Sequence, residues 1–209
     1  MRNRFLFAGT ILWSVAASVV ITVLLSIPLF ALDSGWEHLP QVAGMSEGRL
    51  LMNYHVLMRY LLNPMIGKLK MPDFPDSASA LQHFAEVKGM FLFAIAVMVL
   101  LALVMVVFLR EHVAILVGRG IILVMLVPVV LCGIAALVGF DNFFIAFHKV
   151  LFVGQTSWLF DPDTDPIINV LTDQFFMLTF ILFGLLYEVF WGVVLLSSRR
   201  GYGKANYSS

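Results

Sequence analysis

Two of the five histidines stand in patterns that could support acid–base chemistry. His148 belongs to an aromatic stretch, residues 140–165, in which four side chains repeat every fourth residue and would share one face of a helix: Phe140, Phe144, His148 and Phe152. His83 belongs to a separate polar stretch. An imidazole has an ordinary pKa of about 6.5, so it can accept or donate a proton at neutral pH. We therefore treat His83 and His148 as candidate catalytic residues.

An acidic residue accompanies each histidine at helical spacing. Glu86 follows His83 by three positions, and Asp141 precedes His148 by seven. A carboxylate on the same helix face can orient an imidazole ring through a hydrogen bond, so we assign both acids a supporting role. The alternative for either histidine is a structural role at the membrane surface, where amphipathic rings are common.

Two other kinds of chemistry find less support. Three aspartates alternate in the loop that follows the aromatic stretch: Asp161, Asp163 and Asp165. They do not form an EF-hand, because Pro166 and Thr172 stand where that motif needs glycine and glutamate. No GxSxG motif is present, and the setting of Ser157 does not mark a nucleophile. We expect no metal ion and no other cofactor.

The composition is typical of a polytopic membrane protein. Of the 209 residues, 61% are hydrophobic and 12% are charged, and the mean hydropathy is +0.96. The net charge is zero, which makes nucleic acid an unsuitable partner. The single cysteine, Cys132, lies in an apolar run and is expected to be a small buried hydrophobic residue.

The apolar runs predict an all-α protein with four transmembrane helices, at residues 5–32, 89–109, 120–139 and 175–196. The first run is longer than the core of a signal peptide, so we expect it to be a retained span. The short connections 1–4 and 110–119 and the tail 197–209 hold seven of the 13 basic residues and one of the 13 acids. This bias places them in the cytoplasm. We expect the last nine residues of the tail, GYGKANYSS, to be disordered.

Two long polar segments, residues 33–88 and 140–174, then lie on the outer side, where we expect them to pack together as a cap. An amphipathic helix is predicted at residues 46–62, with an apolar face of Leu50, Leu51, Tyr54, Leu57, Met58 and Leu61. Asn53, Arg59 and Asn63 are expected on its polar face. Asp76 or Ser77 can cap the helix that carries His83 into the second span.

Three runs of residues resemble a known family: FHKVLF followed by SWLFDPDTDPI, the upstream HFAEVK, and NYHVLMRYL. Over nearly its whole length the chain resembles the bacterial lipoprotein intramolecular transacylase family, Lit. Members often carry Asn-Asp before the tryptophan and Pro-Glu before the last span. This chain has Gly154–Ser157 and Thr172–Asp173 at those places. Both departures lie outside the histidine motifs.

The resemblance implies a multi-pass enzyme of the bacterial cell membrane whose active site faces the extracytoplasmic side. Its substrate would be a diacylated lipoprotein, met together with membrane lipid. The acyl chain at glyceryl sn-2 would move to the α-amino group of the N-terminal cysteine and give a lyso-form lipoprotein. By motif, the catalytic histidines of the family fall on His83 and His148.

The residues are compatible with that chemistry. An α-amine must lose a proton and an alkoxide must gain one, so two histidines can serve without an acyl-enzyme. The aromatic residues expected to line a dry pocket are Phe143, Phe144, Phe147, Phe152 and Trp158. Tyr54 is a further candidate for substrate binding, although it could instead hold the cap together.

Two other functions remain open on the sequence. The first is a non-catalytic membrane scaffold or sensor that binds lipid or a partner through its outer aromatic cap. The second is a small transporter that uses Glu188, an acid near the middle of the fourth span.

Overall fold

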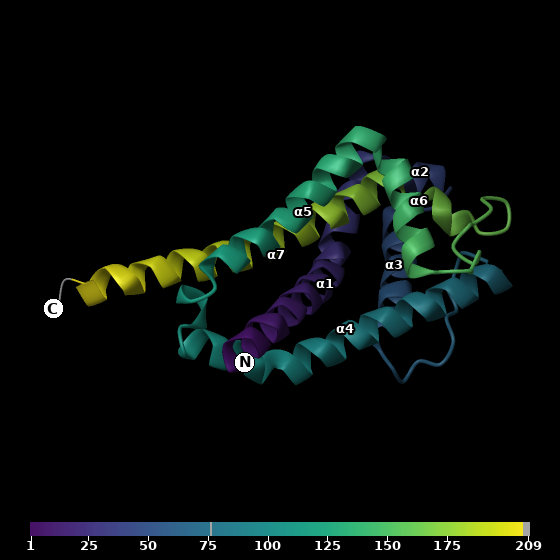
Figure 1. The fold of residues 1–209 in the computed structure, drawn as a ribbon. Helices are drawn as coiled ribbons and strands as arrows, with labels where there is room; N and C mark the ends of the chain where they lie inside the picture. The colour runs from purple at the N-terminus through teal and green to yellow at the C-terminus, as the bar shows by residue number, and fades with distance from the viewer. Residues whose placement is uncertain (76, 207–209) are drawn as a thin grey trace. The chain divides into compact units, whose positions relative to one another are not determined.

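The computed structural model describes the backbone of residues 1–75 and 77–206, and the side chains as far as residue 198. The described residues are helical and contain no strand, which confirms the all-α prediction. In chain order the elements are α1 (Arg2–Trp36), α2 (Leu39–Val42), α3 (Glu47–Leu62), α4 (Ala78–Arg110), η1 (Val113–Ile115), α5 (Gly118–Val138), α6 (Phe140–Leu151), η2 (Pro166–Asn169) and α7 (Asp173–Asn206) (Figure 1).

Four of these helices, α1, α4, α5 and α7, are long and apolar enough to cross a membrane. They contain the predicted spans 5–32, 89–109 and 175–196 and all but the last residue of the span 120–139, since α5 ends at Val138. The limits of the spans within the helices stay predictions. The structure extends α7 to Asn206, so the part of GYGKANYSS that it describes is helical rather than disordered. The remaining residues of that tail, 207–209, lie outside the described residues.

The chain divides into two compact units. The first comprises Met1–Thr22, Ala94–Ile134 and the part of α7 from Ile181. Its core is a cluster of buried side chains: Leu6, Phe108, Val113, Ala114, Ile121, Tyr187, Trp191 and Val194. Trp191 is fully buried and donates a hydrogen bond from its indole nitrogen to Ser14 Oγ over 3.1 Å. This unit contains none of the predicted site residues.

Two residues of the first unit bear on the sequence predictions, Cys132 and Glu188. Cys132 is exposed on α5 rather than buried, because in a chain of few helices one side of each span faces away from the protein. Glu188 has one carboxylate oxygen, Oε1, that is buried without a hydrogen-bond partner among the described residues. The structure therefore gives this acid no partner on that oxygen.

The second unit, Val23–Phe93 and Ala135–Phe180, contains both predicted outer segments. Helix α3 forms where the amphipathic pattern predicted it and ends at Leu62, just before Pro64. It buries five of the six predicted apolar residues: Leu50, Tyr54, Leu57, Met58 and Leu61. Tyr54 stacks on Phe30 with 4.0 Å between ring centres and meets Phe175 edge-on at 5.8 Å. Aromatic burial therefore joins α1, α3 and α7 within this unit.

Asn53 is an exception to the predicted polar face of α3, because it is fully buried. Its amide nitrogen donates to Asp73 Oδ2 over 2.8 Å, and its Oδ1 accepts from the backbone N–H of Asp73 over 3.0 Å. Arg49 also pairs with the Asp73 carboxylate. These bonds hold the pKa of Asp73 below its usual value, through Arg49 first and Asn53 second. Asn53 thus fixes the loop between α3 and α4 instead of meeting solvent.

The two predicted outer segments pack against each other through hydrogen bonds. Asp165 is buried and accepts from the backbone N–H and the hydroxyl of Ser77, at 3.2 and 3.0 Å. Ser77 in turn caps α4, because its Oγ accepts from the N–H of Ala80 over 3.0 Å. The alternative cap, Asp76, lies outside the described residues. Asp165 therefore joins the two segments.

Candidate active site

The rings of His83 and His148 lie beside each other in the second unit. The centres of their rings are 6.0 Å apart, and the ring planes are inclined by 38°. His83 is supplied by the first turns of α4, a helix that continues without a break toward the predicted second span. His148 is supplied by α6, which follows α5 after one residue. The structure thus brings together the two titratable groups selected from the sequence.

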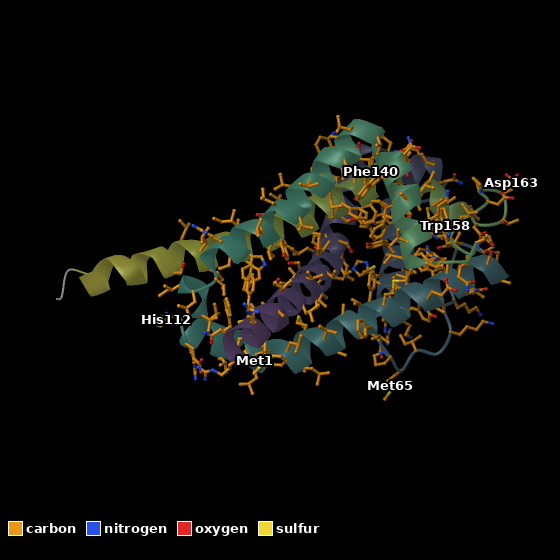
Figure 2. All side chains as sticks on the ribbon, in the orientation of Figure 1. Met1, Met65, His112, Phe140, Trp158 and Asp163 are labelled. Carbon is orange, nitrogen blue, oxygen red and sulfur yellow. The ribbon has the colours of Figure 1, made fainter. Side chains whose placement is uncertain are left out.

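A local feature of the backbone allows α6 to start so soon after α5. Gly139 separates the two helices and has a φ of +86°, in the range that favours glycine because a Cβ is strained there. The predicted stripe then runs along α6, with ring centres 5.9 Å apart for Phe140 and Phe144, and 4.1 Å apart for Phe144 and His148. Figure 2 labels Phe140, the first residue of α6, and Trp158, in the loop after this helix. Because of this helical spacing, the imidazole of His148 lies on the aromatic face of α6.

Aromatic rings enclose both histidines. Phe152 contacts the two rings together, with centres 4.7 Å from His83 and 5.6 Å from His148. Trp158 lies 5.1 Å from His148, and Phe160 meets His83 edge-on at 5.5 Å. As a result His83 is only 8% exposed. Sequence reasoning missed Phe160, although its place two residues after Trp158 in an aromatic loop was a usable signal.

Phe147 and Phe143, two of the predicted lining residues, differ in their contacts with the histidine pair. Phe147 meets His148 at nearly a right angle over 5.7 Å and packs on Phe180 at 4.9 Å. Phe143 contacts Phe140 and Phe180. Phe147 thus touches the site from the side, whereas the ring contacts of Phe143 lie along α6 and α7.

The hydrogen bond of His148 indicates which of its two ring nitrogens carries the hydrogen. Nδ1 lies 2.9 Å from the backbone oxygen of Phe144, and because a carbonyl can only accept, Nδ1 carries the hydrogen. The lone pair of the neutral ring is then on Nε2. Burial lowers the pKa of His148 below its usual value, and the bond to Phe144 raises it by less. His148 therefore favours the neutral form, with Nε2 ready to accept a proton.

His83 is held differently. Its Nδ1 is buried and has no hydrogen-bond partner among the described residues. Its neighbours are the rings of Phe84, His148, Phe152 and Phe160. Packing, and not hydrogen bonding, orients this imidazole.

The two predicted supporting carboxylates bond elsewhere. Glu86 accepts from Gln82 and from Ser157, each over 2.9 Å, and His83 Nδ1 stays unpaired. Asp141 lies beside Asp173, at the start of α7, and makes no hydrogen bond to His148. The prediction that these two acids orient the histidines through hydrogen bonds is therefore wrong in this structure, because each acid interacts with a residue of another element instead.

Tyr54 is not part of the aromatic enclosure. Its ring lies between Phe30 and Phe175, and its hydroxyl is 2.8 Å from Ser26 Oγ. Burial raises the pKa of this hydroxyl well above its usual value. These contacts favour the role of holding the unit together over the role of substrate binding.

Among the described residues, the geometry provides neither an activated serine nucleophile nor a metal site. Ser157 donates its hydroxyl hydrogen to Glu86 and has no contact with an imidazole nitrogen that could activate it. Within the residues described, no three His, Cys, Asp or Glu side chains converge to hold a metal ion.

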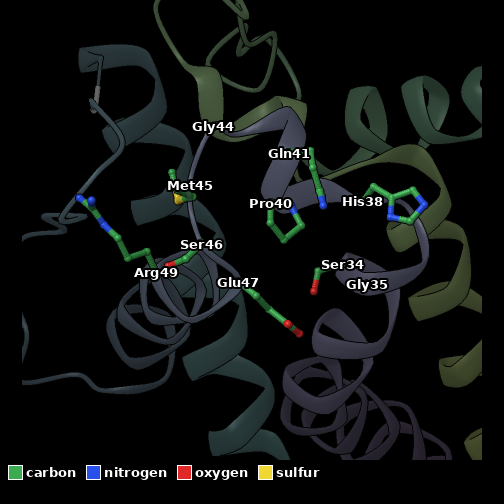
Figure 3. A pocket seen from close by; sticks show the side chains of 10 residues that line it. All are labelled: Ser34, Gly35, His38, Pro40, Gln41, Gly44, Met45, Ser46, Glu47 and Arg49. Atoms are coloured by element: carbon green, nitrogen blue, oxygen red, sulfur yellow. The ribbon is translucent and has the colours of Figure 1, made fainter.

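A separate cavity of about 780 Å³ opens beside the end of α1 (Figure 3). Its lining comes from residues 34–49, and includes His38, Glu47 and Arg49 but neither candidate histidine. His38 has a φ of +55°, an uncommon conformation for a residue with a side chain. The predicted site residues are thus distinct from this cavity.

Comparison with known proteins agrees with this geometry. The family model for the lipoprotein intramolecular transacylase Lit matches residues 5–176. A solved structure of the membrane-integral Lit of Bacillus cereus superposes with a TM-score of 0.81 at 25% identity, and covers 99% of this chain and 98% of its own.

Two variants of the same Bacillus cereus enzyme, in which one histidine is replaced by arginine or by alanine, each superpose with a TM-score of 0.76 at 25% identity. The arginine variant covers 99% of this chain and 95% of its own, and the alanine variant 98% and 96%. A search among curated proteins gave no match. The chain therefore belongs to the lipoprotein intramolecular transacylase family, Lit, and is a bacterial membrane acyltransferase.

Proposed function

We propose that this enzyme moves the sn-2 acyl chain of a diacylglyceryl lipoprotein to the α-amino group of the N-terminal cysteine, with His83 and His148 as the acid–base pair. The observation that supports this most is the 6.0 Å separation of the two rings inside an aromatic enclosure. A pair so placed can serve two proton transfers on one substrate. Family membership favours this function over a scaffold or a transporter.

The reaction is balanced without a co-reactant. The amine nitrogen attacks the ester carbonyl carbon, a C–N bond forms, and the bond to the glyceryl oxygen breaks. One proton leaves the nitrogen and one reaches the glyceryl oxygen. The attack closes a ring of eight atoms: nitrogen, two cysteine carbons, sulfur, two glyceryl carbons, ester oxygen and acyl carbon. Medium rings close reluctantly, so holding amine and carbonyl together is the main task of the protein.

The hydrogen bond between His148 and Phe144 suggests which histidine is the base and which is the acid. His148 presents the lone pair of Nε2, because Nδ1 is committed to the Phe144 carbonyl. We assign it as the base that accepts the proton of the attacking amine. Burial first, and the nearby His148 second, lower the pKa of His83 to about 4, so the resting ring is neutral. His83 then relays to the departing glyceryl oxygen the proton that His148 has taken from the amine.

The aromatic enclosure has a chemical use in this reaction. Water competes with the amine for the ester carbonyl, and its attack would release a fatty acid. Phe152, Trp158 and Phe160 surround the imidazoles with apolar surface. Exclusion of water by these rings favours transfer over hydrolysis.

We also propose that the histidine pair faces the extracytoplasmic side. The support is the charge pattern of the sequence, in which short connections rich in Arg and Lys alternate with two long segments that hold 11 of the 13 acids. Residues 33–88 and 140–174 would then form an outer cap, and both termini would be cytoplasmic.

The decisive experiment uses the purified enzyme and a diacylglyceryl lipopeptide with a deuterated acyl chain at sn-2 only. Intact mass is uninformative because the product is an isomer, so tandem mass spectrometry must locate the labelled chain. We expect it on the cysteine nitrogen. His83→Gln and His148→Gln should each slow its appearance by about 10²- to 10⁴-fold, the usual contribution of one acid–base group.

His55→Gln is the matched control. His55 Nδ1 bonds to the carbonyl four residues earlier, Leu51, over 2.7 Å, as His148 does with Phe144, but His55 is exposed on α3. Its replacement should leave the rate unchanged. Label that stays on glycerol would refute the proposed reaction, and full activity in either site variant would refute the proposed pair.

A further inference from the structure

The loop after α6, residues 152–160, carries the three rings that enclose the histidines but has no regular secondary structure of its own. Phe152, Trp158 and Phe160 all belong to it. His83 Nδ1 is buried and has no hydrogen-bond partner in the part of the chain that the structure describes, so the position of this loop decides how its ring is held. What fixes the loop therefore also fixes the acid–base pair.

Side chains from one face of α4 hold this loop. Ser157 Oγ donates to Glu86 Oε2 over 2.9 Å, and the Ser157 carbonyl accepts from Ser79 Oγ over 3.2 Å. Gln82 donates to Glu86 Oε1 over 2.9 Å and to the side chain of Gln155 over 3.2 Å. Glu86 thus accepts on both of its oxygens, and Ser157 is a buried residue of the loop.

We propose that the Ser157–Glu86 hydrogen bond positions the active site by clamping the aromatic loop onto α4. Ser157 is a positioning residue that acts through Phe152, Trp158 and Phe160, and not a nucleophile. Glu86 serves as the anchor of the loop. This inference rests on the proposed two-histidine reaction.

Two substitutions separate the effect of the Ser157–Glu86 hydrogen bond from the effect of the negative charge of Glu86. Glu86→Gln keeps a side-chain oxygen that can accept from Ser157 but removes the negative charge. Glu86→Ala removes both. A hydroxyl bond to a carboxylate is stronger than a neutral bond, so its loss has a measurable effect.

We expect Ser157→Ala and Glu86→Ala each to lower the single-turnover rate of N-acylation by about ten- to a hundredfold. The double variant should be no slower than Glu86→Ala, because Glu86→Ala already removes the bond that Ser157→Ala removes. Glu86→Gln should stay within about threefold of the wild type, with an unchanged pH profile. Ser198→Ala is the control, since it removes a hydroxyl that, among the residues the structure describes, bonds only to the Leu195 carbonyl of its own helix.

Hydrogen exchange of residues 152–160 gives a readout that does not depend on activity. Exchange should accelerate in Ser157→Ala and Glu86→Ala and stay slow in Glu86→Gln. A rate loss without faster exchange, or faster exchange with an unchanged rate, would overturn the clamp. So would a Glu86→Gln variant as slow as Glu86→Ala with a displaced pH profile, because the charge would then act on His83. Faster exchange together with an inactive wild type would refute the proposed reaction while leaving the clamp intact.

Discussion

Removal of the Tyr54 hydroxyl separates a packing role for this residue from a substrate-binding role. Ser26 Oγ donates its single hydrogen to the Val23 carbonyl over 2.7 Å, so Tyr54 is the donor in its 2.8 Å bond to Ser26. Tyr54→Phe therefore loses one neutral hydrogen bond and leaves no donor unpaired. Its cost should be about 1 kcal/mol of unfolding free energy. The stack on Phe30 and the edge contact with Phe175 stay in place.

The corresponding shift in melting temperature is about 2–4 °C for a chain of this size. Tyr54→Ala removes the ring as well and should cost about 3–5 kcal/mol. Thermal denaturation in detergent and single-turnover N-acylation would be measured on the same samples. We expect Tyr54→Phe to keep a rate within about twofold of the wild type. A loss of tenfold or more with an unchanged melting temperature would refute the packing role and place the hydroxyl on the substrate.

Two further predictions concern proton transfer and orientation. The proposed base must be neutral, and burial lowers the pKa of His148 below 6.5, so the rate of the bound complex should fall about tenfold per pH unit only below that lowered pKa. Trp158→Ala exposes the ring and should move this acid limb upward; a limb that does not move belongs to the substrate amine. Asp163→Cys in a Cys132→Ser background should react with a membrane-impermeant maleimide in intact cells, because Asp163 is exposed in the proposed outer cap. Labelling only after lysis would reverse the proposed orientation.

The sequence predicted the helices because their signals are local or periodic. Apolar length predicted α1, α4, α5 and α7, and the four-residue repeat predicted the aromatic face of α6. The pairing of His83 with His148 was reached through family resemblance and a shared side of the membrane. Both sources indicate that residues are near each other without giving a distance or a ring angle.

The partners of polar side chains could not be predicted in the same way. Glu86 stands at the right spacing for His83 but bonds Ser157, which comes from the other outer segment. Asn53 looked like a surface residue on a helical wheel, yet the loop that carries Asp73 folds over it. In both cases a distant segment competes with a local partner, and a periodic pattern contains no information about that segment.

The short distance between the imidazoles bears on how the enzyme begins a second turnover. In the proposed reaction the amine releases one proton and the glyceryl oxygen takes one up, so the pair as a whole gains and loses nothing. Burial lowers the pKa of both rings, so both are neutral at rest and the proton taken from the amine must leave the pair before the next turnover. With ring centres 6.0 Å apart, that proton has only the width of the pair to cross on its way to the glyceryl oxygen. The transferred proton then never needs to equilibrate with bulk water.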